Sequence, residues 1–353
     1  QSNTTGGENT AVGYASLYTA TTASNNTALG YYALLSNTTG AENTALGAET
    51  LEANTTGTRN TAIGYRALED NTGDMNTAVG AYALPENSTA DNNTAVGRNA
   101  LRFNTTGGTN TALGHQSLES NTTGGNNTAI GGVALDANTT GGDNTSVGLN
   151  SLGSNTTGGS NTALGVSALA ANTTANYNTA VGVNALAGTT TGNSNTAVGI
   201  NAAYELTTGT NNLILGTNAG RASSPSGSLT GSSNQVVLGD NSITNSYIKV
   251  DWTVGSDQRD KTDIQDITTG LDFVKQLKPK SFWFAKERGS DEKHGDKKYG
   301  FLAQDILALE GSDPVIINNK NEDSLTYQGS HLIPILVNAI KELSAKVTAL
   351  EAG

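Results

Sequence analysis

The chain has 353 residues, of which only 14% are charged and 5% aromatic, while 43 are glycines. Its net charge is -12, and residues 1–216 hold 4 arginines against 13 acidic residues. Nucleic-acid binding is therefore not expected, because a phosphate backbone is held mainly by lysine and arginine. The absence of cysteine excludes disulfides and thiolate metal sites. No run of about 18 apolar residues occurs, so membrane insertion is not expected either.

A repeat of nearly constant length fills residues 1–216. Its core, Asn-Thr-Ala-aliphatic-Gly, recurs every 17 residues, apart from one step of 16 residues between Asn60 and Asn76. The repeats begin at Asn9, Asn26, Asn43, Asn60, Asn76, Asn93, Asn110, Asn127, Asn144, Asn161, Asn178 and Asn195, and a looser one, NLILG, begins at Asn212. Such regularity indicates a solenoid, in which each unit packs on its neighbours.

Each unit contains two short runs that can form strands, and an Asn-Thr-Thr-Gly-Gly turn closes it. Seventeen residues are too few for a helix-turn-helix unit, and no 3.6-residue apolar period appears, so the unit is a β coil. In NTTGGNNTAIGGVAL at 121–135, small Ala129 precedes large Ile130. Adjacent strand residues point to opposite faces, so one of them fills the core and the other needs a partner. The smallness of alanine predicts that the alanine face approaches neighbouring chains in an oligomer.

The repeat resembles those of phage tail fibres and, more distantly, the head repeats of trimeric autotransporter adhesins. The resemblance covers residues 3–216 and implies a trimeric, parallel β-roll or β-solenoid shaft, displayed outside a cell or on a virion. Coils stacked about 4.8 Å apart would make thirteen units into a shaft on the order of 60 Å long. We assign residues 1–219 to this shaft.

Two surface features of the shaft each have two interpretations. The Asn-Thr-Thr triplets match the N-glycosylation sequon, but the structural need for asparagine in turns also explains them. Tyr14, Tyr31 and Tyr65 follow the core glycine at a position where residues vary. They could stack on carbohydrate, or they could occupy an unconstrained surface position.

The composition changes after residue 219. Residues 220–233 are rich in serine and glycine, and NQVVLG, SYIKV and DWTV then look like short strands, so 220–255 is predicted to be a linker with a short β connector. Along 331–351, apolar residues spaced alternately by three and four predict a C-terminal helix with a coiled-coil seam. The seam consists of Ile333, Leu336, Ile340, Leu343, Val347 and Leu350.

Three ordered segments follow the linker: SDQRDKTDI at 256–264, LDFVKQLKPKSFWF at 271–284 and YGFLAQDI at 299–306. Together they resemble the intramolecular chaperone domain of phage tailspikes and fibres, the self-cleaving peptidase S74 family. The resemblance covers residues 256–353. It implies a small α+β chaperone domain that assembles a homotrimer.

The family's Ser-Asp-x-Arg-x-Lys motif falls on Ser256, Asp257, Arg259 and Lys261. The resemblance implies that Ser256 is the nucleophile, that Lys261 is the general base and that the chain is cut between Gly255 and Ser256. Such chemistry is physically reasonable, because a serine hydroxyl needs a base and a desolvated lysine can lose its proton.

Other motif residues qualify this interpretation. Gly300 and Gln304, in GFLAQD, match the family's chaperone core. The residue before the lysine is usually leucine, but here it is Asp260, whose charge favours protonated Lys261, so cleavage could be slow or absent. Alternatively, Ser256 and Lys261 are surface residues at a strand-to-helix boundary.

The expected function is that of a homotrimeric virion tail fibre that attaches to a host surface carbohydrate or protein receptor. The alternative is a bacterial extracellular adhesin or surface filament with the same chaperone. A capsule depolymerase would need two carboxylates about 5 to 9 Å apart, and the acidic residues of the shaft are scattered in sequence. No metal site or cofactor is expected, because His115, His294 and His331 lie in no ligand-spaced motif.

Overall fold

The computed structural model describes residues 3–243, 256–285, 289–319 and 325–353. The chain divides into two compact units, Gln1–Asp240 and Asn241–Gly353. The first unit is mainly β and the second is α+β.

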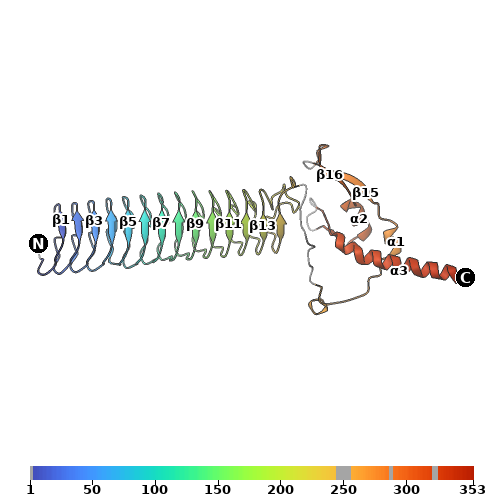
Figure 1. Ribbon diagram of the computed structural model, residues 1–353, viewed down its shortest axis with the longest axis horizontal. Helices are drawn as coiled ribbons and strands as arrows, with labels where there is room; N and C mark the ends of the chain where they lie inside the picture. Colours follow the sequence, from blue (N-terminus) through green and yellow to red (C-terminus); the bar gives the residue numbers. More distant parts are fainter. Residues whose placement is uncertain (1–2, 244–255, 286–288, 320–324) are drawn as a thin grey trace. The chain divides into compact units, whose positions relative to one another are not determined.

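The first unit is a parallel β-solenoid, which confirms the fold predicted from the 17-residue repeat. Its strands form one 14-stranded sheet whose order follows the chain, and Figure 1 shows them side by side, one per coil. Neighbouring strands pair in register, so that Ala112 lies beside Ala129. The strands are β1 (Thr10–Val12), β2 (Thr27–Leu29), β3 (Thr44–Leu46), β4 (Thr61–Ile63), β5 (Thr77–Val79), β6 (Thr94–Val96), β7 (Thr111–Leu113), β8 (Thr128–Ile130), β9 (Thr145–Val147), β10 (Thr162–Leu164), β11 (Thr179–Val181), β12 (Thr196–Val198), β13 (Leu213–Leu215) and β14 (Val236–Leu238).

The strand faces are the reverse of the prediction. Ala129 is fully buried in the coil, whereas Ile130 keeps 36% of its surface exposed. The prediction that alanine faces outward is therefore wrong. The physical reason is the small interior of a 17-residue coil: Leu135 and buried asparagines already fill it, so only a small side chain fits on the inner face of the strand.

The second apolar run of each unit is a turn rather than a strand. Val133 and Leu135 have φ values of 50° and 52°, in the left-handed region that non-glycine residues rarely adopt. The N–H of Leu135 donates to the carbonyl of Ser151 in the next coil at 3.1 Å. Full burial of the leucine, worth about 1.5–3 kcal/mol, offsets a backbone strain of about 1–3 kcal/mol.

Two columns of buried asparagines run through the solenoid. In the first, the N–H of Asn127 donates to Oδ1 of Asn110 at 3.0 Å. In the second, Nδ2 of Asn121 donates to Oδ1 of Asn104 at 2.8 Å. The second column contains the sequon asparagines Asn37, Asn54, Asn104, Asn121, Asn138, Asn155 and Asn172, and all of them are fully buried. The folded shaft therefore does not present these amides for glycosylation.

The second column is interrupted where the repeat is irregular. Asn54 precedes the one 16-residue step, and its Oδ1 is buried without a hydrogen-bond partner. Asn172 is followed in the column by Thr189, whose hydroxyl donates to the carbonyl of Leu206 instead, and Oδ1 of Asn172 also lacks a partner. Each of these two irregularities thus leaves one buried acceptor of the second column unsatisfied.

The last coil is longer than the others. β14 pairs with β13 across a spacing of 23 residues, with Leu213 beside Val236. Within the intervening loop, Leu229 is only 2% exposed and extends the core. β14 lies within the predicted strand NQVVLG, whereas SYIKV and DWTV fall outside the described residues.

The second unit is built from short elements and one long helix. They are η1 (Gln258–Asp260), α1 (Leu271–Val274), β15 (Lys280–Ala285), β16 (Lys293–Gly300), α2 (Ala303–Glu310), β17 (Ile317–Asn318), β18 (Thr326–Tyr327), η2 (Gly329–His331) and α3 (Leu332–Glu351). β15 pairs with β16 and β17 with β18, both antiparallel. Its core is formed by Ile306, Ile316, Ile317 and Leu332. The small α+β region and its C-terminal helix are as predicted, and no helix in the described ranges is long and apolar enough to cross a membrane.

Candidate functional site

The turn that contains the Ser-Asp-x-Arg-x-Lys motif is held by its own charged side chains. The carboxylate of Asp257 caps η1 by accepting the N–H of Arg259 at 2.9 Å. The guanidinium of Arg259 donates to both oxygens of the same carboxylate, at 3.0 and 2.6 Å. These hydrogen bonds lower the pKa of Asp257 from its ordinary value.

Within this turn, the structure brings together the two residues predicted to form a dyad. Nζ of Lys261 donates to Oγ of Ser256 at 2.7 Å and to the carbonyl oxygen of Ser256 at 2.9 Å. Both side chains are exposed to solvent. The contact has the length that proton transfer requires, but the chain alone does not supply the burial that helps a lysine amine to lose its proton.

The other motif residues lie in three different places. Gly255, on the far side of the expected scissile bond, and the side chain of Asp260 lie outside the described residues. Gly300 ends β16, where it pairs with Lys280, and Gln304 is exposed in the first turn of α2. Among the residues that the structure describes, neither Gly300 nor Gln304 hydrogen-bonds to the turn at Ser256.

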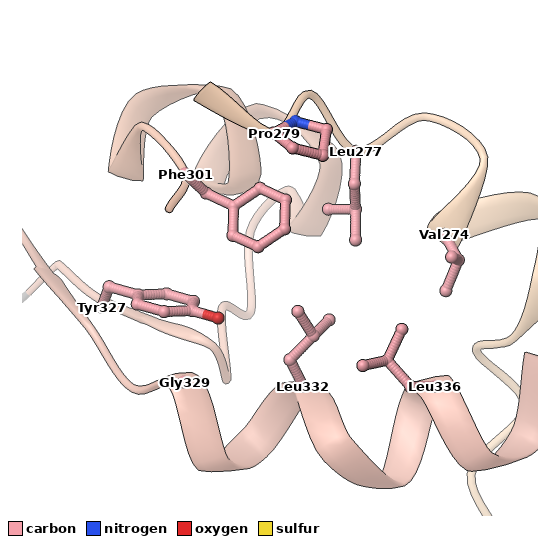
Figure 2. Close-up of a pocket in the computed structure, with 8 residues that line it drawn as sticks. All are labelled: Val274, Leu277, Pro279, Phe301, Tyr327, Gly329, Leu332 and Leu336. Carbon is pink, nitrogen blue, oxygen red and sulfur yellow. The ribbon is translucent and has the colours of Figure 1, made fainter. Parts of the chain in front are cut away.

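An apolar groove of about 430 Å³ lies in the second unit. It is lined by Val274, Leu277, Pro279, Phe301, Tyr327, Gly329, Leu332 and Leu336. Figure 2 shows Leu332 and Leu336 pointing from α3 toward the groove. Burial raises the pKa of the Tyr327 hydroxyl. Sequence reasoning missed this groove because its walls come from segments that are distant in the chain.

Two carboxylates fix the elements around the groove. Glu342 on α3 accepts the N–H of Leu271 at 2.9 Å and thereby ties α1 to α3. Glu310, at the end of α2, accepts three consecutive backbone N–H groups, those of residues 315–317, at 2.6 to 3.0 Å. No local motif marks either residue, so their roles emerge only from the folded chain.

The shaft gathers three acidic residues that are separated in sequence. Ligand oxygens of Glu49, Glu52 and Glu69 lie within 4.8 Å of one another. Arg66 pairs with Glu49 at 2.6 Å and with Glu69 at 3.7 Å. Burial raises the pKa of Glu52 and of Glu69. The arginine between the carboxylates makes this an ion-pair cluster, although the sequence suggested scattered acidic residues.

Aromatic rings collect on the first coils. Tyr31 stacks on Tyr32 with ring centroids 3.9 Å apart and on Tyr14 at 5.5 Å. Tyr14 is 68% exposed and Tyr31 46% exposed. Further along the same face, Arg66 lies over the ring of Tyr65 at 5.3 Å.

Comparison with known proteins bears on the second unit. Residues 256–311 match the family model Peptidase S74, described as a chaperone of endosialidase. This region is a peptidase S74 domain. The match includes all three motif segments identified in the sequence and ends before α3. No curated protein and no solved structure matches the chain.

Proposed function

We propose that this chain is the shaft and assembly domain of a homotrimeric fibre that attaches to a host cell surface, as in a phage tail. One observation carries the proposal: a 14-stranded solenoid is followed in the same chain by an S74 domain. A bacterial extracellular adhesin with the same domain is the alternative. In both functions the solenoid gives the fibre its length and the S74 domain directs its assembly.

Assembly needs such a domain because the shaft repeats look alike. Three chains with nearly identical coils can pair one coil out of step, and non-local pairing is a slow search. The exposed seam of α3, which includes Ile340 at 66% and Leu350 at 81%, suits packing against two further copies. Association at the C-terminus then sets the register from which the shaft forms.

The S74 domain also cuts the chain in this proposal. Oγ of Ser256 attacks the carbonyl carbon of Gly255 while the amine of Lys261 accepts the hydroxyl proton. The peptide bond breaks, its nitrogen takes a proton and becomes the new amino terminus, and an ester joins Gly255 to Oγ. Water hydrolyses the ester, which releases the Gly255 carboxylate and restores the hydroxyl. Removal of the assembly domain then makes the fibre kinetically stable.

Intact mass measurement of purified chains tests the cleavage. The wild type is expected to give fragments that meet between Gly255 and Ser256, and Ser256→Ala and Lys261→Ala are expected to give only full-length chain. Ser281→Ala, on exposed strand β15, is the matched control and should be cut like the wild type. An uncut wild type, or cutting of Ser256→Ala, contradicts the proposed dyad.

Attachment is the second part of the proposal, and the exposed rings of Tyr14 and Tyr31 support it. Aromatic faces can stack on the apolar faces of sugars, and their hydroxyls can donate to sugar oxygens. Binding of labelled fibre to host cells should fall for Tyr14→Ala and Tyr31→Ala. It should persist for Tyr177→Ala, whose ring is 69% exposed on a distant coil. Equal binding by all variants would contradict this placement.

A further inference from the structure

An unbroken line of large aliphatic side chains covers the outer face of the sheet. The third residue of every strand from β1 to β14 belongs to it, and each is exposed or half-buried. We call it the outer row: Val12, Leu29, Leu46, Ile63, Val79, Val96, Leu113, Ile130, Val147, Leu164, Val181, Val198, Leu215 and Leu238.

The outer row has the chemistry of a contact surface rather than of a solvated face. All its members are valine, leucine or isoleucine, and the 16-residue step does not interrupt it, because Ile63 lies in register beside Val79. The first residue of each strand, which shares this face, is threonine in β1 to β12 and apolar in β13 and β14. A soluble protein rarely exposes an apolar patch as long as this one.

The surface is of sufficient size for a stable association. Side chains of the row are as much as half exposed, such as Val12 at 56% and Leu238 at 52%. Over fourteen strands, the row and its flanking threonines expose on the order of 1,000 Å², comparable with the roughly 800 Å² that each partner buries in a standard protein interface.

Periodicity identifies the partner. The row presents one aliphatic side chain per coil, about every 4.8 Å over the whole sheet. A second copy of this chain, parallel and in step, offers the same spacing over the same length, and cyclic symmetry brings each residue opposite its equivalents in the other copies. We infer that the outer row faces the axis of the fibre and packs against the outer rows of two further copies. This inference rests on the proposed trimer and adds which face the copies share.

The absence of cysteine in the chain makes the inference directly testable. Leu113→Cys places one thiol on the row in β7. Thr123→Cys places one in the exposed turn of the same coil and serves as the matched control. Both are made in the Ser256→Ala background, so that all chains have the same length. Each full-length protein is oxidised and then run on a non-reducing denaturing gel, and its native mass is measured by sedimentation.

Both variants should sediment as trimers, and Leu113→Cys should give disulfide-linked chain pairs while Thr123→Cys stays single. A trifunctional maleimide should join three chains of the first variant only. Trimers that become linked in Thr123→Cys but not in Leu113→Cys would overturn the placement of the row and leave the proposed trimer intact. A monomeric chain would overturn both and leave the row to a different occupant.

Discussion

Replacing Asn121 with alanine removes one member of the second asparagine column from the middle of the shaft. Nδ2 of Asn121 donates to Oδ1 of Asn104 at 2.8 Å, and Oδ1 accepts from Nδ2 of Asn138 at 2.8 Å. The carbonyl of Gly124, which Asn121 also contacts, keeps a second donor in Asn110. The substitution therefore leaves two buried polar groups without a hydrogen-bond partner: Oδ1 of Asn104 and one N–H of Nδ2 of Asn138.

Asn54→Ala is a matched comparison in the same column. It strands only Oδ1 of Asn37, since the Gly57 carbonyl keeps its bond from Asn43. It also removes Oδ1 of Asn54, which already lacks a partner, so the number of stranded groups does not change. Each unsatisfied buried group costs about 1–3 kcal/mol. We expect Asn121→Ala to lower the free energy of unfolding by about 2–6 kcal/mol more than Asn54→Ala.

Guanidinium unfolding followed by circular dichroism measures this difference in the Ser256→Ala background at one chain concentration. Hydrogen exchange, read by mass spectrometry on peptides from the mutated coil, shows whether the loss is local. Thr123→Ala, in the exposed turn next to Asn121, should behave like the parent. Equal losses for Asn121→Ala and Asn54→Ala would refute the idea that hydrogen bonds between neighbouring asparagines of the column stabilise the shaft.

Further substitutions test the shaft core, the close approach of neighbouring coils and the S74 motif. Leu118→Ala empties a fully buried position and should cost about 2–5 kcal/mol in the same unfolding experiment. Gly131→Ala places a Cβ at φ 136° and against the backbone of the next coil. We expect a lower yield of folded shaft and greater sensitivity to protease. Asp260→Leu replaces the acidic residue before Lys261 with the leucine that this motif usually carries, and time-resolved mass measurement should show faster cleavage. Arg259→Gln should return the pKa of Asp257 toward its ordinary value, seen by NMR titration. The pKa of Asp257 is lower in the folded chain than in the unfolded chain. The ion pair between Asp257 and Arg259 therefore stabilises the fold fully above the unfolded-state pKa of Asp257, and this contribution is lost as the pH falls through the folded-state pKa.

The sequence predicted the solenoid because its 17-residue period reports directly on the stacking of coils. Ser256 and Lys261 were singled out by the resemblance to the peptidase S74 motif, and the structure places their side chains in contact. The helix α3 followed from the alternating spacing of its apolar residues by three and four. In each of these cases the information is local or strictly periodic.

The sequence did not reveal which side of each strand is the interior. Ala129 and Ile130 point to opposite faces of the strand whichever of them is buried. The leucine of the second run leaves little volume inside the coil, and this volume decides that the alanine is the buried residue. The left-handed φ of Leu135 was likewise hidden, because leucine normally avoids that region. Asparagine is common in turns, so its second role in buried columns left no separate signal. The groove beside Leu336 needed the tertiary structure.

Sedimentation equilibrium of the Ser256→Ala chain tests whether the protein is a homotrimer. We expect a single species of three times the 36.0 kDa chain mass, which persists on dilution. A chain expressed without residues 331–353 should fail to assemble into that species. A species of the Ser256→Ala chain at the mass of one chain across the same concentrations would contradict the homotrimer.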